Sequence, residues 1–322
     1  MPRREKVIIE QEISLLTDKK IILSIYCIIT IFFFSTIEVV GKLVGSGISP
    51  YAITAWRFLI GGLLIFPLAL KEISQRKYKL KALNYFEFFL AGILIVCISM
   101  LLLQLSIFYG KAVLSAAIVS TNTIFVTVLA VVFLKEKITF LHVVGLIIGL
   151  IGLFLIIYGE KEVLRQSHNL VLGVVFGLGA AITFAVYTVF SKRLIQLYGN
   201  MTTLCFAFIF GACALFVYSL LMNKSITFVP DFKNLSLLMY LSFFVTGLAY
   251  ILYFTAVKEL GAAKASLYFF LKPAIAAILA WLIHSEQLKL IQIMGIILIM
   301  LSLSRQTILN LLESKLIRID NQ

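Results

Sequence analysis

The sequence predicts an all-α integral membrane protein of ten transmembrane helices, built as two inverted five-helix repeats. Three observations support this. The 322 residues are 61% hydrophobic, with a mean hydropathy of +1.07, whereas only about half of the residues of a soluble domain are apolar. The apolar residues form runs long enough to cross a bilayer. The order of these runs also repeats along the chain.

Each predicted helix is an apolar run of roughly 20 residues, the length that spans the hydrocarbon core. The connecting segments are too short to hold a soluble domain. The runs cover residues 21–41, 50–70, 86–108, 112–134, 139–158, 171–191, 201–222, 235–257, 263–283 and 289–309. The chain is therefore divided into an N-terminal segment (1–20), a first repeat (21–158), a linker (159–170), a second repeat (171–309) and a C-terminal tail (310–322).

The basic residues indicate the orientation. The net charge is +13, but the lysines and arginines lie mainly in short loops, so we expect the bilayer and not nucleic acid as the partner. With the N-terminus inside, 19 of the 28 basic residues fall on the inner side and 7 on the outer side, leaving Arg57 and Lys272 within spans. Because cytoplasmic loops are enriched in Lys and Arg, we predict a multi-pass protein of the cell membrane with both termini cytoplasmic.

The repeat has a constant offset. Residues 135–145 align with 285–295, and the same offset of 150 places Asn122 on Lys272. Each unit holds five spans, an odd number, so the two copies must be inverted in the membrane. Inverted repeats are typical of secondary transporters, whose sites lie near the midplane between the repeats.

Lys272 and Pro273 lie in the middle of the ninth span. A central lysine costs at least ~2.5–3.5 kcal/mol on insertion scales, so it should face protein, water or a ligand. Pro273 lacks an N–H and should kink the helix, freeing a carbonyl near Phe269. We interpret Lys272 as an anchor for a substrate carboxylate or phosphate. The alternative is a fixed partner for an acidic residue or for the freed carbonyls.

Glu38 is the one carboxylate deep in the first half. At ~1.5 Å per residue, it lies roughly 5 Å inside the outer end of its helix, and Arg57 about 10 Å inside the same side. A structural Glu38–Arg57 ion pair is therefore one interpretation, and a site for a substrate amine or a proton is the other. Arg57 itself is interpreted as a structural ion-pair partner.

The remaining candidates for the substrate site are polar or aromatic residues within spans. Asn122 shares the depth of Lys272 through the repeat, and Gln104 is a weaker candidate of the same kind; interhelical hydrogen bonding is their alternative role. Aromatic side chains could line a site for a substrate with an apolar body, although packing is the more common role of such side chains. These are Tyr250, Phe254, Tyr268 and Tyr187.

Nothing in the sequence indicates an enzyme, a cofactor or a metal. The three histidines have no metal-ligand spacing, the four cysteines lie singly within apolar runs, and HExxH, P-loop and GxSxG motifs are absent. An integral membrane enzyme that modifies lipid is the rival class, but it would need a nucleophile, paired carboxylates or a metal cluster near an interface.

The chain resembles the drug/metabolite transporter superfamily, in particular its EamA-type ten-helix members. The supporting stretches are Trp56-Arg57-Phe58, Ser115-Ala116-Ala117, Leu134 to Thr139, Leu271-Lys272-Pro273 and Ser285-Glu286. The resemblance implies a central cavity bordered by spans 1, 3, 4, 6, 8 and 9, and the export or exchange of small metabolites such as amino acids, nucleotide sugars, triose phosphates or drugs.

One departure concerns the fourth span, where members often have a proline and this chain has Ser120-Thr121-Asn122-Thr123. We therefore expect the kink to be confined to the ninth span. The preferred hypothesis is a secondary transporter that exports an amino acid or similar zwitterion by alternating access, with organic anions, phosphorylated metabolites or drugs as alternative substrates. Whether the chain forms a homo-oligomer is left open.

Overall fold

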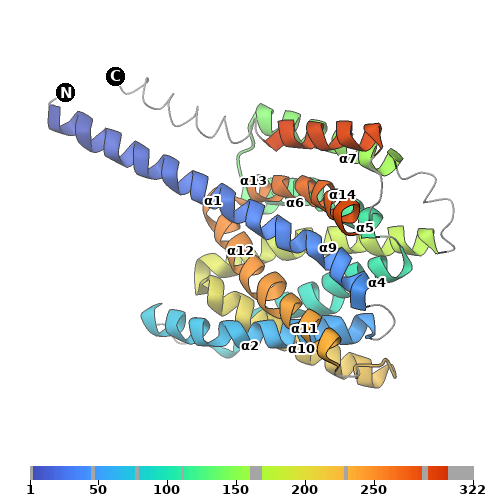
Figure 1. The fold of residues 1–322 in the computed structure, drawn as a ribbon. Coiled ribbons are helices and arrows are strands. Elements are labelled where there is room, and N and C mark those ends of the chain that lie inside the picture. Colours follow the sequence, from blue (N-terminus) through green and yellow to red (C-terminus); the bar gives the residue numbers. More distant parts are fainter. Residues whose placement is uncertain are drawn as a thin grey trace.

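The computed structural model describes residues 3–44, 48–76, 80–110, 112–159, 169–227, 231–284 and 289–303. All regular structure in these ranges is helical (Figure 1). Most of the predicted linker, Ser285-Glu286 and the tail (310–322) lie outside the described residues. The helices are α1 (Arg3–Val44), α2 (Pro50–Arg76), α3 (Ala82–Gly92), η2 (Ile93–Met100), α4 (Leu101–Tyr109), α5 (Ala112–Ser120), α6 (Asn122–Leu134), α7 (Phe140–Gly159), α9 (Leu170–Tyr198), α10 (Asn200–Leu221), α11 (Phe232–Tyr240), η3 (Leu241–Leu248), α12 (Ala249–Leu260), α13 (Ala262–Ser266), η4 (Leu267–Phe270) and α14 (Leu271–His284).

These helices combine into membrane-length segments. Within the described residues, nine segments are long and apolar enough to cross a bilayer, and Leu290–Leu303 is a shorter apolar helix. All ten coincide with predicted runs. The first helix differs from the prediction because it begins at Arg3. Residues 3–20 therefore extend the helix of the first span at its N-terminal end. In Figure 1 this part of α1 projects beyond the other helices.

Close packing of the bundle depends on glycines at helix crossings. A Cβ at Gly92 would lie 2.4 Å from the Ala207 carbonyl oxygen of α10, and one at Gly152 would lie 2.7 Å from the Gly295 carbonyl oxygen. Neither distance leaves room for a side chain. Small residues allow helix backbones to approach closely in a membrane, where packing and not the hydrophobic effect holds helices together.

Four spans depart from regular α-helix at their centres. The third and eighth contain the π-helical segments η2 and η3, and the ninth contains the 3₁₀ turn η4, which ends just before Lys272 and Pro273.

The expectation that only the ninth span is interrupted is wrong. The fourth span is interrupted at Thr121, whose hydroxyl donates to the Ile118 carbonyl (2.6 Å) and whose N–H bonds the same carbonyl (3.0 Å). The fourth span is therefore interrupted without a proline, at a threonine whose hydroxyl bonds the preceding turn of the backbone.

Two helices, α10 and α13, directly follow a glycine, and each has its N-terminus capped by a glutamate from elsewhere in the fold. Glu72, in α2, accepts hydrogen bonds from the N–H groups of Asn200 (3.1 Å) and Thr202 (2.8 Å) at the start of α10. Glu136, just after α6, accepts from Ala262 (2.8 Å) and Ala263 (3.1 Å) at the start of α13. A carboxylate at a helix N-terminus satisfies N–H groups that have no partner within the helix and complements the helix dipole.

Candidate functional site

The centre of the site is an ion pair between Lys272 of α14 and Glu38 of α1. The Lys272 Nζ lies 2.6 Å from Glu38 Oε1, and the side chains are 2% and 0% exposed. The Ser35 hydroxyl, one turn before Glu38, also donates to the Lys272 carbonyl (3.3 Å). The structure therefore joins α1 to α14 at the depth where the 3₁₀ turn interrupts the ninth span.

This pairing corrects the prediction for Arg57. Glu38 pairs with Lys272, and among the described residues Arg57 has no ion-pair partner. Depth along a helix was the basis for expecting a Glu38–Arg57 pair, but depth does not determine which way a side chain faces.

Arg57 is fully buried in α2 and lacks the partners that a guanidinium normally has. In the described part of the chain its Nε, Nη1 and Nη2 atoms have no hydrogen-bond acceptor. Its Cζ lies 4.8 Å from the centre of the neighbouring Phe58 ring, a cation–π contact. A buried charge without acceptors is costly, so Arg57 is a candidate residue for a functional site within a membrane-spanning segment.

The Glu38 carboxylate is also poorly satisfied. Neither oxygen has a donor in hydrogen-bond geometry among the described residues, although Lys272 Nζ is within hydrogen-bond distance of one of them. The contact is therefore an ion pair with an unfavourable angle. A buried pair is strongly stabilised only when further hydrogen bonds satisfy its remaining atoms, so Glu38 can accept another donor.

A small cavity lies beside Lys272. It has a volume of about 10 Å³ for the centre of a water-sized sphere, which is room for about one water molecule. Its lining is mainly apolar and aromatic: Phe34, Ile37, Met100, Leu103, Val119, Phe184, Tyr250, Phe269 and Lys272. Lys272 thus borders an aromatic chamber that the surrounding side chains nearly fill.

The predicted site residues are all buried, but the structure does not bring all of them to this cavity. Lys272 and Tyr250 line it. Phe254 and Tyr187 pack edge-to-face on each other behind it, with ring centres 5.4 Å apart. Three further candidates, Asn122, Gln104 and Tyr268, are buried and do not line the cavity.

Asn122 and Gln104 each retain an unsatisfied polar atom. The side-chain nitrogen of Asn122 and the side-chain oxygen of Gln104 have no hydrogen-bond partner among the described residues. Next to Asn122, the Thr123 hydroxyl donates to the Ser266 carbonyl (2.8 Å) and joins the fourth span to the ninth. These two residues could therefore bond a ligand if the chamber widened toward the Thr121 interruption.

Sequence reasoning missed most of the aromatic lining. Phe34 packs on Tyr250 and Phe269, with ring centres 5.0 and 5.9 Å apart. Helical spacing carries a partial signal, because Phe34 is four residues before Glu38 and Phe269 three before Lys272, and such residues share a helix face. Phe184 has no charged residue at that spacing, so nothing distinguishes it from packing residues.

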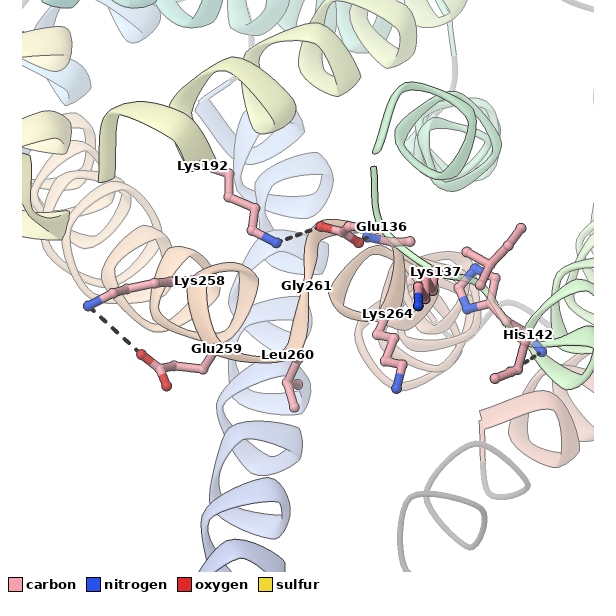
Figure 2. A pocket seen from close by; sticks show the side chains of 12 residues that line it. Glu136, Lys137, His142, Lys192, Lys258, Glu259, Leu260, Gly261 and Lys264 are labelled. Carbon is pink, nitrogen blue, oxygen red and sulfur yellow. Dashed lines mark hydrogen bonds and ion pairs between the residues drawn. The ribbon is translucent and has the colours of Figure 1, made fainter. Parts of the chain in front are cut away.

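A second Lys–Glu pair, which sequence reasoning did not single out, lies at the Glu136 cap (Figure 2). Lys192 Nζ of α9 is 2.6 Å from Glu136 Oε1. Lys135 adopts a left-handed conformation after α6 (φ 54°), which turns the chain so that Glu136 can reach α13. The available signal was the Lys135-Glu136-Lys137 stretch between the fourth and fifth predicted spans.

No metal site is present in the described parts of the chain, where no three His, Cys, Asp or Glu side chains lie together. The groups buried at the bundle centre are two cations, one carboxylate and several aromatic rings, which can hold a small charged molecule with an apolar body.

Comparisons with known proteins give a consistent result. The model of the EamA-like transporter family matches residues 21–158 and 171–304. An uncharacterized transporter of Clostridium kluyveri is 35% identical over 281 residues, covering 86% of this chain and 90% of that protein. The uncharacterized transporter YyaM of Bacillus subtilis is 26% identical, covering 79% and 83%. One crystal structure matches with a TM-score of 0.70 at 15% identity, covering 89% of this chain and 97% of that one, which shows the same fold.

Proposed function

The chain belongs to the EamA-like transporter family, and on this premise we propose that it exports a small metabolite with a carboxylate, foremost an amino acid or similar zwitterion. Transport would proceed by alternating access between the predicted repeats 21–158 and 171–309. Both termini would be cytoplasmic, as the distribution of basic residues indicates. The sequence contains no ATP-binding motif, so a gradient of substrate or ion would supply the energy.

The observation that carries the proposal is the fully buried guanidinium of Arg57, which has no hydrogen-bond acceptor among the described residues, together with the buried Lys272–Glu38 pair. Arg presents several N–H donors in a planar arrangement that matches a carboxylate. A substrate carboxylate would supply the missing acceptor. Lys272, the site residue first suggested by the sequence, would share the carboxylate when its contact with Glu38 opens.

Glu38 supports an amino acid in particular. Its oxygens lack hydrogen-bond donors in the described structure, and an ammonium group would supply up to three. The substrate would thus exchange with the internal pair, its carboxylate meeting the two cations and its ammonium meeting Glu38. The aromatic lining of Phe34, Tyr250 and Phe269 would hold an apolar side chain.

Binding requires the chamber to widen, because its present volume of about 10 Å³ holds no amino acid. The interruptions at Thr121 and at Leu267–Phe270 are positions where the fourth and ninth spans could bend. Broken helices border the substrate sites of many secondary transporters. We propose that these two spans move relative to each other as the chamber opens.

A second candidate substrate is an organic anion, including a phosphorylated metabolite. The supporting observation is the balance of buried charge, because among the described residues the predicted spans bury two cations, Arg57 and Lys272, with one carboxylate, Glu38. A singly charged anion would neutralise these charges, whereas a zwitterion would leave one positive charge. The lipid-modifying enzyme of the rival class gains no support, since the family is one of transporters.

The test is uptake into proteoliposomes with labelled neutral amino acids, organic anions and organic amines. We expect saturable flux of amino acids, inhibited by related zwitterions and not by amines. Arg57→Met and Lys272→Met should each abolish the flux, and Lys224→Met, a substitution outside the bundle centre, should not. Flux of anions alone would select the second candidate. Amino-acid flux that survives both substitutions would contradict the proposed site.

A further inference from the structure

A second hollow lies at the Glu136 cap, separate from the cavity of the central site, and we call it the Glu136 pocket (Figure 2). Its volume is about 290 Å³, close to the lower limit of roughly 300 Å³ for pockets that hold small ligands. Thr139 and Lys258 in its lining are exposed, so the pocket opens to the surface, and by the predicted orientation this end of the bundle is cytoplasmic. Both predicted repeats line the pocket, the first with Glu136, Thr139 and His142 and the second with Lys192, Lys258 and Gly261.

The helices α9 and α12 connect this pocket with the cavity of the central site. In α9, Phe184 lines the cavity and Lys192 lines the pocket. In α12, Tyr250 lines the cavity and Lys258 lines the pocket. Each interval corresponds to about 12 Å along a helix, at ~1.5 Å per residue. The two hollows therefore lie at the two ends of one short stretch between the same pair of helices.

An aromatic pair blocks this stretch. Tyr187 of α9 and Phe254 of α12 are fully buried and pack edge-to-face, with ring centres 5.4 Å apart. On the side of the cavity, Tyr187 packs on Phe184 and Phe254 packs on Tyr250, each with ring centres 6.3 Å apart. Tyr187 and Phe254 also follow these lining residues by three and four positions, in the direction of the pocket. The pair therefore separates the cavity from the pocket.

Buried hydroxyl groups along the same stretch give a second, independent indication. The hydroxyls of Tyr187, Ser191 and Tyr253 have no hydrogen-bond partner among the described residues, and all three side chains are fully buried. Buried polar groups are normally hydrogen-bonded, and leaving them unpaired in a membrane protein is costly. Permanent packing between α9 and α12 would not require these hydroxyls, whereas a route that becomes wet in another conformation would satisfy them.

We propose that Tyr187 and Phe254 form a gate between the central cavity and the Glu136 pocket, and that the pocket is the vestibule through which the substrate reaches this gate from the cytoplasm. When the two rings separate, the hydroxyls of Ser191 and Tyr253 bond the passing substrate or its water. The inference rests on the proposed transport function. It assigns Tyr187 and Phe254 to the control of access and not to the binding site itself.

The accessibility of a thiol placed in the cavity tests the gate without measuring transport. Val119 lines the cavity and is 3% exposed, so Val119→Cys places a thiol of similar size behind the gate. A small, permanently charged methanethiosulfonate is added to the cytoplasmic face of inside-out vesicles, and labelling at position 119 is followed by mass spectrometry. We expect labelling about tenfold faster when Tyr187→Ala and Phe254→Ala are added, because an aromatic pair contributes about that factor to the closed state.

The two faces of the membrane should differ. In right-side-out vesicles, the same reagent should label position 119 at the same rate with and without the gate substitutions. An unchanged rate from the cytoplasmic face, or an acceleration from the outer face, would overturn the proposal. Because labelling requires no substrate, either result leaves the amino-acid flux experiment unaffected. A failure of the gate is therefore distinguishable from a failure of the proposed function.

A matched aromatic pair checks that the effect arises at the gate. Phe88 and Phe206 stack with ring centres 5.6 Å apart and line neither hollow. Phe88→Ala/Phe206→Ala should not accelerate labelling at position 119, and an equal acceleration would overturn the proposal. The native Cys205, which is fully buried, reports loss of the fold and should stay unlabelled. If the double alanine variant exposes Cys205, Tyr187→Leu takes its place with an expected acceleration of about threefold, and an unchanged rate overturns the proposal.

Discussion

Two Lys–Glu pairs in this protein have the same N–O distance and different surroundings. Lys272–Glu38 and Lys192–Glu136 are both 2.6 Å long. The first is almost completely buried, and its carboxylate has no donor in hydrogen-bond geometry among the described residues. The second is about 9% and 15% exposed, and Glu136 also accepts two backbone hydrogen bonds.

The comparison teaches that distance alone does not distinguish a structural pair from an exchangeable one. A buried ion pair must overcome the loss of hydration of both charges, and it does so only when other groups complete its hydrogen bonds. Glu136 has those groups and resembles Glu72, which caps α10 in the same way. Glu38 has no such groups among the described residues, which is why the proposed substrate could replace Lys272 by providing donors.

Removing Lys272 should have the largest effect. In Lys272→Met, Glu38 is left as a buried charge without its partner, and we expect a loss of about 3–5 kcal/mol of stability, together with loss of flux. The double variant Glu38→Gln/Lys272→Met should recover most of the stability but no transport. Thermal unfolding in detergent and proteoliposome flux measure the two effects. A double variant that transports normally would show that the pair is only structural.

Glu136→Gln should be less destabilising, by about 1–3 kcal/mol, because an amide keeps one acceptor oxygen but loses the charge. In this pair, substituting Lys192 as well should not restore the stability that Glu136→Gln loses. Lys192→Met/Glu136→Gln still leaves α13 with a weakened cap, so its melting temperature should stay at or below that of Glu136→Gln. Recovery equal to that of the Glu38/Lys272 double variant would remove the distinction between the two pairs.

Gly261→Ala tests the geometry of the Glu136 cap. Gly261 has φ +102° and ψ 152°, a region open almost only to glycine, and an added Cβ would lie 2.9 Å from Glu136 Oε2. We expect a loss of about 1–3 kcal/mol. Gly247→Ala is a suitable comparison, since its φ is not positive and its nearest contact would be at 3.3 Å. Equal melting temperatures for the two variants would contradict the expected strain.

The exposed pair Lys19–Glu259 should contribute least to stability of the ion pairs compared. Its 2.7 Å contact is as short as the buried ones, but Lys19 is 58% exposed. Lys19→Ala should change stability by at most about 1 kcal/mol, since solvent and salt screen surface pairs. The effect should vanish at high salt, and a larger or salt-independent change in melting temperature would show that Lys19 has another role.

The positions of the spans could be predicted from the sequence, but the partners of the buried charges could not. Apolar runs predict every membrane-length segment, and the depth of Lys272 follows from its position in one of them. Depth alone placed Glu38 nearer to Arg57 than to Lys272, which is its partner in the structure. The interruption at Thr121 also escaped prediction, because many threonines bond their own backbone without interrupting a helix.

The sequence by itself determined that this chain is a helical membrane protein with a few charges placed within its spans. The hydropathy and the length of an apolar run are properties of that local segment, and they decide whether it can cross a bilayer. Only the tertiary structure decided that Lys272 meets Glu38, that Lys192 meets Glu136, and that Arg57 has no acceptor among the described residues. These facts depend on the rotation and crossing of helices, which are set by packing between segments far apart in the chain.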